Sequence, residues 1–187
     1  MNVFILDNCP IVAAQSQCDK HIPKMVVESA QMLSTTHRML DGVQCIRPSK
    51  SGKTNVKYWE IQDDRESLLY KAVHMNHPCT VWTRETSENY LWHYRHFVAL
   101  CDEYMHRFEK RHLSDKLLRH ALSFIPVNIT NWGLTTFPLA MKSNPECMFP
   151  EDPVKSYRLF YQTKQSRFKM LWNRNRDCPS WFKAING

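Results

Sequence analysis

The sequence predicts a mainly α protein, a single compact domain over residues 1–187 with about five helices and a long irregular stretch before the last helix. Three observations support this prediction. Apolar residues recur at helical spacings over long segments, and glycine is scarce, with four in 187 residues. The length fits the usual size of one domain, about 100–200 residues. A composition of 43% apolar and 23% charged residues is typical of a globular chain and not of a disordered one.

The first predicted helix covers residues 10–40 and contains Pro23. Because a proline inside a helix removes a backbone hydrogen bond and clashes with the preceding turn, we expect a kink or a break between Cys18 and Pro23. Gly42 follows this helix, and the next residues are basic and rich in turn formers. Residues 41–60 are therefore expected to form a basic loop.

Capping residues and prolines place the remaining helices. Pro78 stands in the first turn of a short helix that Asn76 or His77 caps. Ser87 caps the clearest helix, in which aromatic residues alternate in steps of four and three. In chain order the expected helices are 78–85, 87–111, 114–124 and one that opens at 152–153. Prolines mark 125–151 as an irregular loop, and 152–187 are expected to form a basic C-terminal helix and tail.

Positive charge is concentrated at the end of the chain. Residues 155–187 contain eight Lys or Arg and one acidic residue, and the whole chain has a net charge of +7. These cations are interleaved with aromatic residues, so they supply phosphate partners together with flat surfaces on which bases stack. Nucleic acid is the expected partner, although a solvated helix face above an aromatic core gives the same pattern. A membrane surface is not expected, because the tail lacks a continuous apolar face.

A polar stripe on the first helix is the strongest candidate site. Its spacing of three, four and three residues places a base, a cation, a carboxylate and an amide on one face. The members of the stripe are His21, Lys24, Glu28 and Gln31. The stripe borders the apolar face, where burial shifts pKa values toward catalytic use. The alternative is a solvated pair between Lys24 and Glu28, four residues apart.

No metal or cofactor is expected. Two Glu-x-x-His pairs, which begin at Glu103 and Glu109, lie about 240° apart around one predicted helix, so they do not face a single metal ion. The sequence has no glycine-rich phosphate loop and no Gly-x-Ser-x-Gly elbow. Cys18 stands three residues before His21, where it is either a nucleophile or, more simply, a small half-buried helix residue.

Cysteine usage and the start of the chain indicate a compartment. Seven cysteines without a Cys-x-x-Cys pair indicate reduced thiols. Residues 1–7 have no basic leader and meet an acid early, so no signal peptide is expected. No apolar run reaches the roughly 18–20 residues of a membrane span. We therefore expect a cytoplasmic protein, and we expect a monomer.

Four short segments carry a resemblance through their content and their order. The first is Asp19-Lys20-His21 with Glu28 seven residues after the histidine, and the others are Asn76-His77-Pro78, 100–108 and 178–183. They are similar, in this order, to the Asp-x-His and catalytic glutamate, the His-Pro motif, the Glu-x-x-x-Arg-Gly-Tyr helix and the Pro-Thr-Trp-Tyr-Lys ending of one family. That family is the pyrimidine-dimer DNA glycosylases, the endonuclease V of the T-even phages and its bacterial relatives. The matched pieces cover about half of the chain, and its extra length lies at 41–75 and 124–152.

The resemblance implies a helical DNA glycosylase, with or without lyase activity, that bends duplex DNA and cleaves the N-glycosidic bond of a damaged or modified pyrimidine. In that family the N-terminal α-amine attacks the sugar C1′ to form a Schiff base, and the glutamate assists this step and the later strand cleavage. Carried over, Glu28 is the catalytic carboxylate, His21 is its neighbour, and Met1 or Asn2 supplies the amine. DNA contacts are expected from Lys20, Lys24, Gln31, His77, Arg107, Arg167, Arg174, Arg176 and Trp181.

Two departures from the family leave alternatives open. The family enzyme exposes a threonine after loss of its methionine, whereas Asn2 is bulky, so the nucleophile is either the amine of Met1 or absent. If it is absent, Glu28 activates water and no lyase step follows. The arginines that flank the family glutamate are also missing, because Val27 precedes Glu28 and Gln31 takes the place of a later one. Phosphate contacts are then expected from Lys20, Lys24, the 47–57 loop or the basic tail.

Two other functions remain open at this point. One is a catalytically inert nucleic-acid-binding phage protein on the same fold, and the other is an enzyme that acts on nucleotides. A phage-encoded protein of either kind is expected in the cytoplasm of the host cell.

Overall fold

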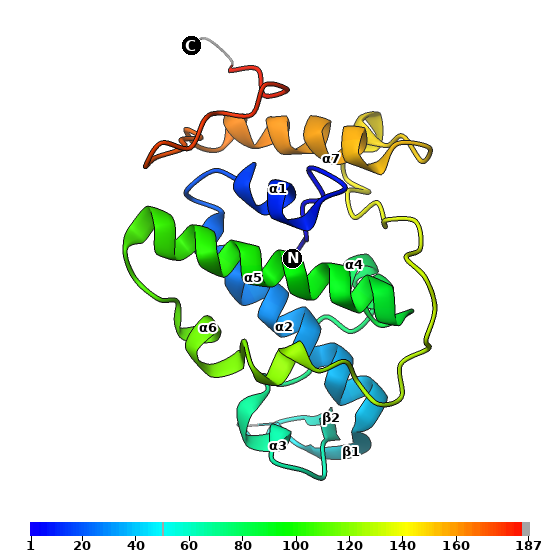
Figure 1. Cartoon of the computed structure of the whole chain (residues 1–187). Helices are drawn as coiled ribbons and strands as arrows, with labels where there is room; N and C mark the ends of the chain where they lie inside the picture. The colour runs from blue at the N-terminus through cyan, green and yellow to red at the C-terminus, as the bar shows by residue number, and fades with distance from the viewer. Residues whose placement is uncertain (50, 185–187) are drawn as a thin grey trace.

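The computed structural model describes residues 1–49 and 51–184. This part of the chain is mainly α, as predicted, with seven α-helices and one two-stranded sheet. The long helix α5 (Ser87–Phe108) crosses α2 (Ile22–Asp41) at the centre, and α4 (Pro78–Thr83) packs against α2. Figure 1 shows α7 (Pro153–Gln162) beyond the N-terminal segment at one end of the molecule and the sheet at the other.

The predicted break in the first helix is confirmed. Helix α1 (Pro10–Gln15) ends before Cys18, and α2 begins at Ile22 with Pro23 in its first turn. A proline costs no hydrogen bond there, because the first N–H groups of a helix have no partner within it. The backbone between the two helices is held by the core instead, since the N–H of Cys18 donates to the Tyr161 hydroxyl at 2.9 Å.

The prediction of a loop at 41–60 is wrong. This segment forms an antiparallel hairpin of β1 (Val43–Pro48) and β2 (Asn55–Glu60). Valine, isoleucine and aromatic residues on the two strands favour the extended conformation, and the basic residues beside them concealed that signal. Gly52 allows the turn, because its φ of 72° lies in the left-handed region. Lys50 of the predicted loop lies outside the described residues.

Local capping explains most of the other helix boundaries. His77 caps α4 as expected, with Nδ1 accepting from the N–H of Cys79 at 3.2 Å. Thr86 caps α5 in place of Ser87. The predicted helix at 114–124 is divided into α6 (Leu113–Leu118), which His112 caps, and a 3-10 turn at Ala121–Ser123.

The regions on either side of α7 are mostly irregular. Within the predicted loop at 125–151 the structure has one 3-10 turn, Pro145–Cys147. The last helix begins at Pro153 with Asp152 as its cap, but it ends at Gln162 and is followed by the 3-10 turn Thr163–Ser166. The basic tail is therefore mainly non-helical. A short helix that was not expected, α3 (Arg65–Leu68), follows the hairpin.

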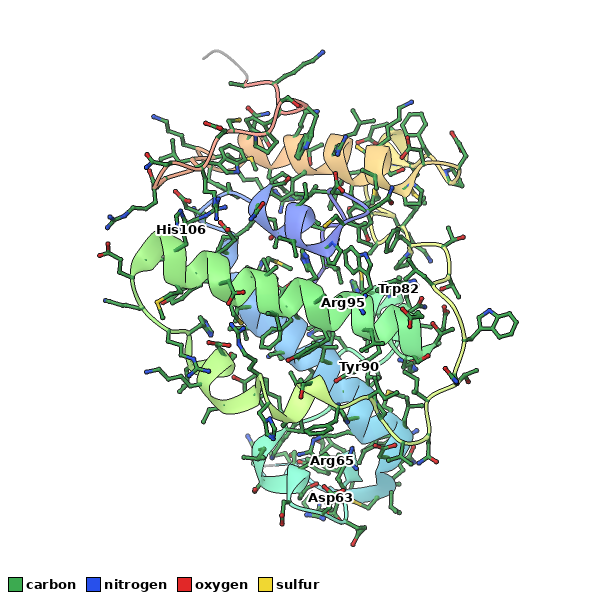
Figure 2. The ribbon with its side chains drawn as sticks, in the orientation of Figure 1. Asp63, Arg65, Trp82, Tyr90, Arg95 and His106 are labelled. Carbon is green, nitrogen blue, oxygen red and sulfur yellow. The ribbon has the colours of Figure 1, made fainter. Side chains whose placement is uncertain are left out.

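A buried polar network joins α2, α3 and α5 near the hairpin. Nδ1 of His37 lies 3.1 Å from Nη1 of Arg65, and its Nε2 lies 2.7 Å from the Tyr90 hydroxyl. Arg65 also donates to Asp41 at 2.6 Å and to Asp63 at 2.8 Å. Figure 2 shows Asp63 and Arg65 together at the hairpin end, with Tyr90 further into the molecule. Because Arg65 occupies Nδ1, the His37 ring has one proton, on Nε2.

Arg107 ties the end of α5 to the end of α1. Its side chain is 0% exposed and donates to the carbonyls of Gln15 and Gln17, to Asp19 and to the carboxylate of Glu103. The carbonyls lie at and after the C-terminus of α1, where backbone acceptors have no helical partner. The expectation that Arg107 contacts DNA is therefore wrong, because its guanidinium is buried and saturated.

The first prediction concerns this buried cation. We expect Arg107→Met to lower the free energy of unfolding by about 3 kcal/mol, because it leaves two carbonyls without their donor and Asp19 without its cationic partner. Arg95→Met removes an exposed arginine from the same helix and should change stability by no more than about 0.5 kcal/mol. Urea unfolding of both variants measures this, and equal stabilities would contradict the role given to Arg107.

The second prediction concerns acid sensitivity. Burial lowers the pKa of His21, His37 and His96 to about 4 and that of His93 to about 3. Since the unfolded chain takes up these protons near pH 6.5, stability is full above that pH and is lost as the pH falls toward 4. We expect a loss of about 1 kcal/mol per histidine between about pH 7.5 and about pH 5.5.

Urea unfolding at several pH values measures this loss. His93→Gln should make the pH dependence shallower by about one proton, and His120→Gln, at an exposed ring, is the matched control. An unchanged pH dependence in His93→Gln would contradict the assignment.

Candidate active site

Glu28 lies in the second turn of α2, with the start of the chain against its carboxylate. The N–H of Asn2 donates to Oε2 at 2.9 Å, and the α-amine of Met1 lies 3.8 Å from the same oxygen. Nζ of Lys24, one turn earlier on the helix, lies 3.5 Å from Oε1. The pair between Lys24 and Glu28 therefore forms, but the Glu28 side chain is only 13% exposed and is not part of a solvated face.

The side chain of Asn2 fixes the position of the amine. Its Nδ2 donates to the carbonyl of Ala140 at 3.2 Å, and its Oδ1 accepts from the N–H of Phe4 at 3.0 Å. Phe4 has a φ of 52°, in the left-handed region that residues with a side chain seldom adopt. Its ring stacks on His21 with centroids 5.1 Å apart, so packing maintains this conformation. These contacts hold the backbone of the first four residues in one conformation.

His77 joins the site from the start of α4. Its Nδ1 accepts the cap hydrogen bond from Cys79, so the neutral ring carries its proton on Nε2. Burial lowers the pKa of His77, the positive N-terminus lowers it further, and the Glu28 carboxylate and a hydrogen bond to the Met1 backbone oppose both effects. The histidine of the predicted Asn-His-Pro segment therefore lies beside the amine and the glutamate.

His21 packs next to the site from the start of α2. It is buried at the start of α2, with Nδ1 2.7 Å from the Tyr161 hydroxyl and the ring edge-on to Phe168. Burial, assisted by Lys24, Lys164 and Lys20, lowers the pKa of His21 to about 4. The ring is neutral near pH 7, and it contributes to the site through its packing contacts.

A basic cluster borders Glu28 and consists of Lys20, Lys24, Lys164 and Arg167. Burial lowers the pKa of Lys164, and the nearby charges of Arg167 and Lys24 lower it further, while Cys147 opposes them. Nζ of Lys164 lies 3.6 Å from the centre of the Phe160 ring, and Nζ of Lys20 lies 4.5 Å from that of Phe168. Cations that repel one another on an aromatic surface favour an anion between them.

The tail residues predicted to contact DNA mostly hold the tail in place. Arg176 donates to both oxygens of the buried Glu103 carboxylate, at 2.6 and 3.0 Å. Arg174 pairs with Glu109 at 3.0 Å, at the C-terminal end of α5. The half-buried ring of Trp181 packs edge-on against Tyr161 and Phe182. Arg167 joins the basic cluster, and Gln31 is half-buried one turn beyond Glu28.

Some residues of this site were not in the predicted set. Phe4, Tyr161 and Lys164 lie far from α2 in sequence, and the helical spacing of α2 carries no signal for them. Within residues 1–49 and 51–184, no three His, Cys, Asp or Glu side chains come together as a metal site, and no described helix is long and apolar enough to span a membrane. Cys18 is buried, and burial raises its pKa, which disfavours the thiolate.

Comparison with family models, with curated proteins and with solved structures gives no match for this chain.

The third prediction tests the anchoring of the N-terminus. Asn2→Ala removes two hydrogen bonds and leaves the Ala140 carbonyl and the Phe4 N–H without partners, so unfolding should become easier by about 1–3 kcal/mol. Asn8→Ala, at an exposed position in the same segment, is the matched control and should stay within about 0.5 kcal/mol. Urea unfolding measures both variants, and a neutral Asn2→Ala would show that the N-terminus is not anchored in this way.

Proposed function

We propose that this protein is a DNA glycosylase that cleaves the N-glycosidic bond of a damaged or modified pyrimidine in duplex DNA. The observation that carries the proposal is the α-amine 3.8 Å from a carboxylate that is itself largely buried. The resemblance to the phage pyrimidine-dimer DNA glycosylases implies the same pair of groups. The basic cluster beside Glu28 supplies positive charge for the phosphates that flank the reacting nucleotide.

An α-amine suits this reaction because unperturbed α-amines have a pKa of about 7.7–8.0, so about a tenth or more of such amines are neutral at pH 7. Unperturbed lysines have a pKa of about 10.4 and are almost entirely protonated at that pH. The amine lone pair forms a bond to C1′ as the bond from C1′ to the base breaks, and the base leaves with that electron pair and gains a proton. The C1′–O4′ bond then breaks as the nitrogen lone pair forms the C1′=N bond of the protonated Schiff base, and O4′ gains the proton that the attacking amine lost. Glu28 is placed to accept the proton that the attacking amine loses and to stabilise the positive charge that develops on the sugar.

The identity of the attacking group has three alternatives with different products. The amine of Met1 is one, and the backbone N of Asn2 is the second, because it already lies 2.9 Å from Glu28 and becomes an α-amine if Met1 is removed. In the third, Glu28 activates a water molecule, and base release occurs without a Schiff base. In each of them the duplex must first be opened to expose the target nucleotide.

The fourth prediction tests the role of Glu28. Glu28→Gln should bind duplex DNA with little change in affinity and should release base at least about a hundredfold more slowly, because a general base and a stabilising charge are lost. The assay is borohydride trapping and base release on duplexes that contain pyrimidine dimers, modified pyrimidines or abasic sites. Glu151→Gln removes an exposed carboxylate and is the matched control.

The outcomes of this assay separate the alternatives. A trapped adduct that mass spectrometry maps to Met1 or Asn2 identifies the amine, and free base without an adduct identifies water as the nucleophile. A fully active Glu28→Gln ends the assignment of Glu28. Binding without any product on any duplex favours the alternative, an inert nucleic-acid-binding protein.

A further inference from the structure

The β1–β2 hairpin is the largest exposed element that the candidate site does not use. Its register pairs Val43 with Glu60 and Pro48 with Asn55, and no third described strand extends the sheet. None of its twelve paired residues is buried, and Ile46 is 64% exposed. The hairpin is therefore mainly a surface element and adds little to the core.

This surface carries positive charge without enough nearby acid to neutralise it. Arg47, Lys53 and Lys57 on the hairpin and Lys71 after it are all exposed. Of the neighbouring acids, Glu60 pairs with Arg47, Glu66 with Arg38 and Asp63 with Arg65. Asp64 is exposed and forms no salt bridge within the described residues. Lys53, Lys57 and Lys71 form no salt bridge within the described residues, and their exposed positive charge complements a polyanion.

A groove brings part of this charge together. Lys57, Tyr58 and Lys71 line it with Arg47, on one side of the hairpin. Nζ of Lys71 and the guanidinium of Arg47 lie 5.3 and 5.9 Å from the centre of the Tyr58 ring. The cations are thus held over an aromatic surface with their charged ends near solvent.

The segment from Lys71 to His77 connects this surface to the candidate active site along α2. The hydroxyl of Thr35 bonds both the N–H and the carbonyl of Val73, at 3.1 and 3.2 Å, and Arg38 donates to the carbonyl of Tyr70 at 2.7 Å. The same segment ends at His77, beside Met1 and Glu28. This segment therefore runs along α2 from the groove at the hairpin to the site at Glu28.

The length of α2 sets the distance between the two basic regions. Glu28 and Arg38 are ten helical residues apart, about 15 Å, and the hairpin begins beyond Arg38. At about 3.4 Å per base pair, a contact some 20 Å from Glu28 falls about six base pairs from the target nucleotide. The basic cluster lies on the other side of Glu28, toward the start of α2.

We propose that the hairpin, with Lys71, binds the phosphate backbone of duplex DNA about half a helical turn from the reacting nucleotide, on the side away from the basic cluster. This inference rests on the proposed function and adds a second contact to it. The duplex would then run along α2, held on both sides of the position where the base must leave the stack, so that each contact opposes closure of the opened site.

The test compares two pairs of lysines with the same total charge. The first variant is Lys53→Ala with Lys57→Ala on the hairpin, and the control is Lys110→Ala with Lys116→Ala near the end of α5 and on α6, all four exposed. The probe is a duplex of about three helical turns with a stable abasic-site analogue at its centre. Binding is measured over a range of salt concentrations, and hydroxyl-radical footprints are recorded on both strands.

We expect the hairpin variant to reduce the slope of log K against log salt by about two, one for each lost phosphate contact. It should also lose protection about six base pairs from the analogue on one side only, while protection at the analogue itself remains. The control should keep the slope and footprint of the wild-type protein. Exposed lysines without partners are not needed for folding, so circular dichroism of both variants should match the wild type.

Each of the other outcomes contradicts either the hairpin contact alone or the hairpin contact together with the proposed function. A hairpin variant with the wild-type slope and footprint, in a protein that still binds and processes DNA, rejects the hairpin contact and leaves the proposed function intact. A wild-type protein that does not bind the duplex, or that binds single-stranded RNA more tightly, rejects both. Equal losses in the hairpin variant and the control indicate general attraction to DNA and also reject the hairpin contact.

Discussion

The burial of residues 3–6 is the constraint on which the rest of the site depends. Val3, Ile5 and Leu6 are completely buried, yet they belong to no strand or helix, so their backbone groups need partners from elsewhere. Side chains supply several of them: Asn2 bonds the N–H of Phe4, and Arg158 on α7 donates to the carbonyl of Leu6 at 2.8 Å. Because this segment is fixed, the amine that precedes it is held at one position, next to α2. The first residue of the chain is therefore positioned by the core.

Charge in the sequence and charge on the surface differ in this protein, because many of its arginines are used in internal ion pairs. The tail contains an excess of cations, but Arg176 neutralises the buried Glu103 and Arg158 bonds Asp7 and a carbonyl. Most of the exposed cations are lysines, including those at the start of α2 and on the hairpin, with Arg95 and Arg167 as exposed arginines that form no salt bridge within the described residues. Arginine, with its planar fork, suits several fixed acceptors at once, whereas lysine keeps one mobile charge in water. The different roles of arginine and lysine in this protein follow from this chemistry.

Local features of the fold could be predicted from the sequence, and features that depend on distant partners could not. The break predicted before Pro23, the helix start at Pro78 and the core helix predicted from the aromatic spacing of α5 are all present, because each signal acts within a few residues. Arg107 looked like a surface cation since its acceptors at Gln15 and Gln17 lie some 90 residues away. The hairpin was missed because charge and turn formers outweighed its short β-branched pattern. At the site, Glu28, Lys24 and His77 were predicted, but Lys164 and Tyr161 come from α7 and its end, which no spacing on α2 reveals.

The position of the first residue limits how this protein can be handled. The Met1 side chain is 4% exposed, and its amine lies 3.8 Å from a Glu28 oxygen, so a purification tag fused before Met1 would replace this amine by an amide beside the carboxylate. Such a fusion loses a basic nitrogen, and it also disturbs the Asn2 and His77 contacts that surround it. A tag placed after the tail leaves these groups as they are. A recombinant protein that appears inert therefore needs its N-terminus checked before its chemistry is judged.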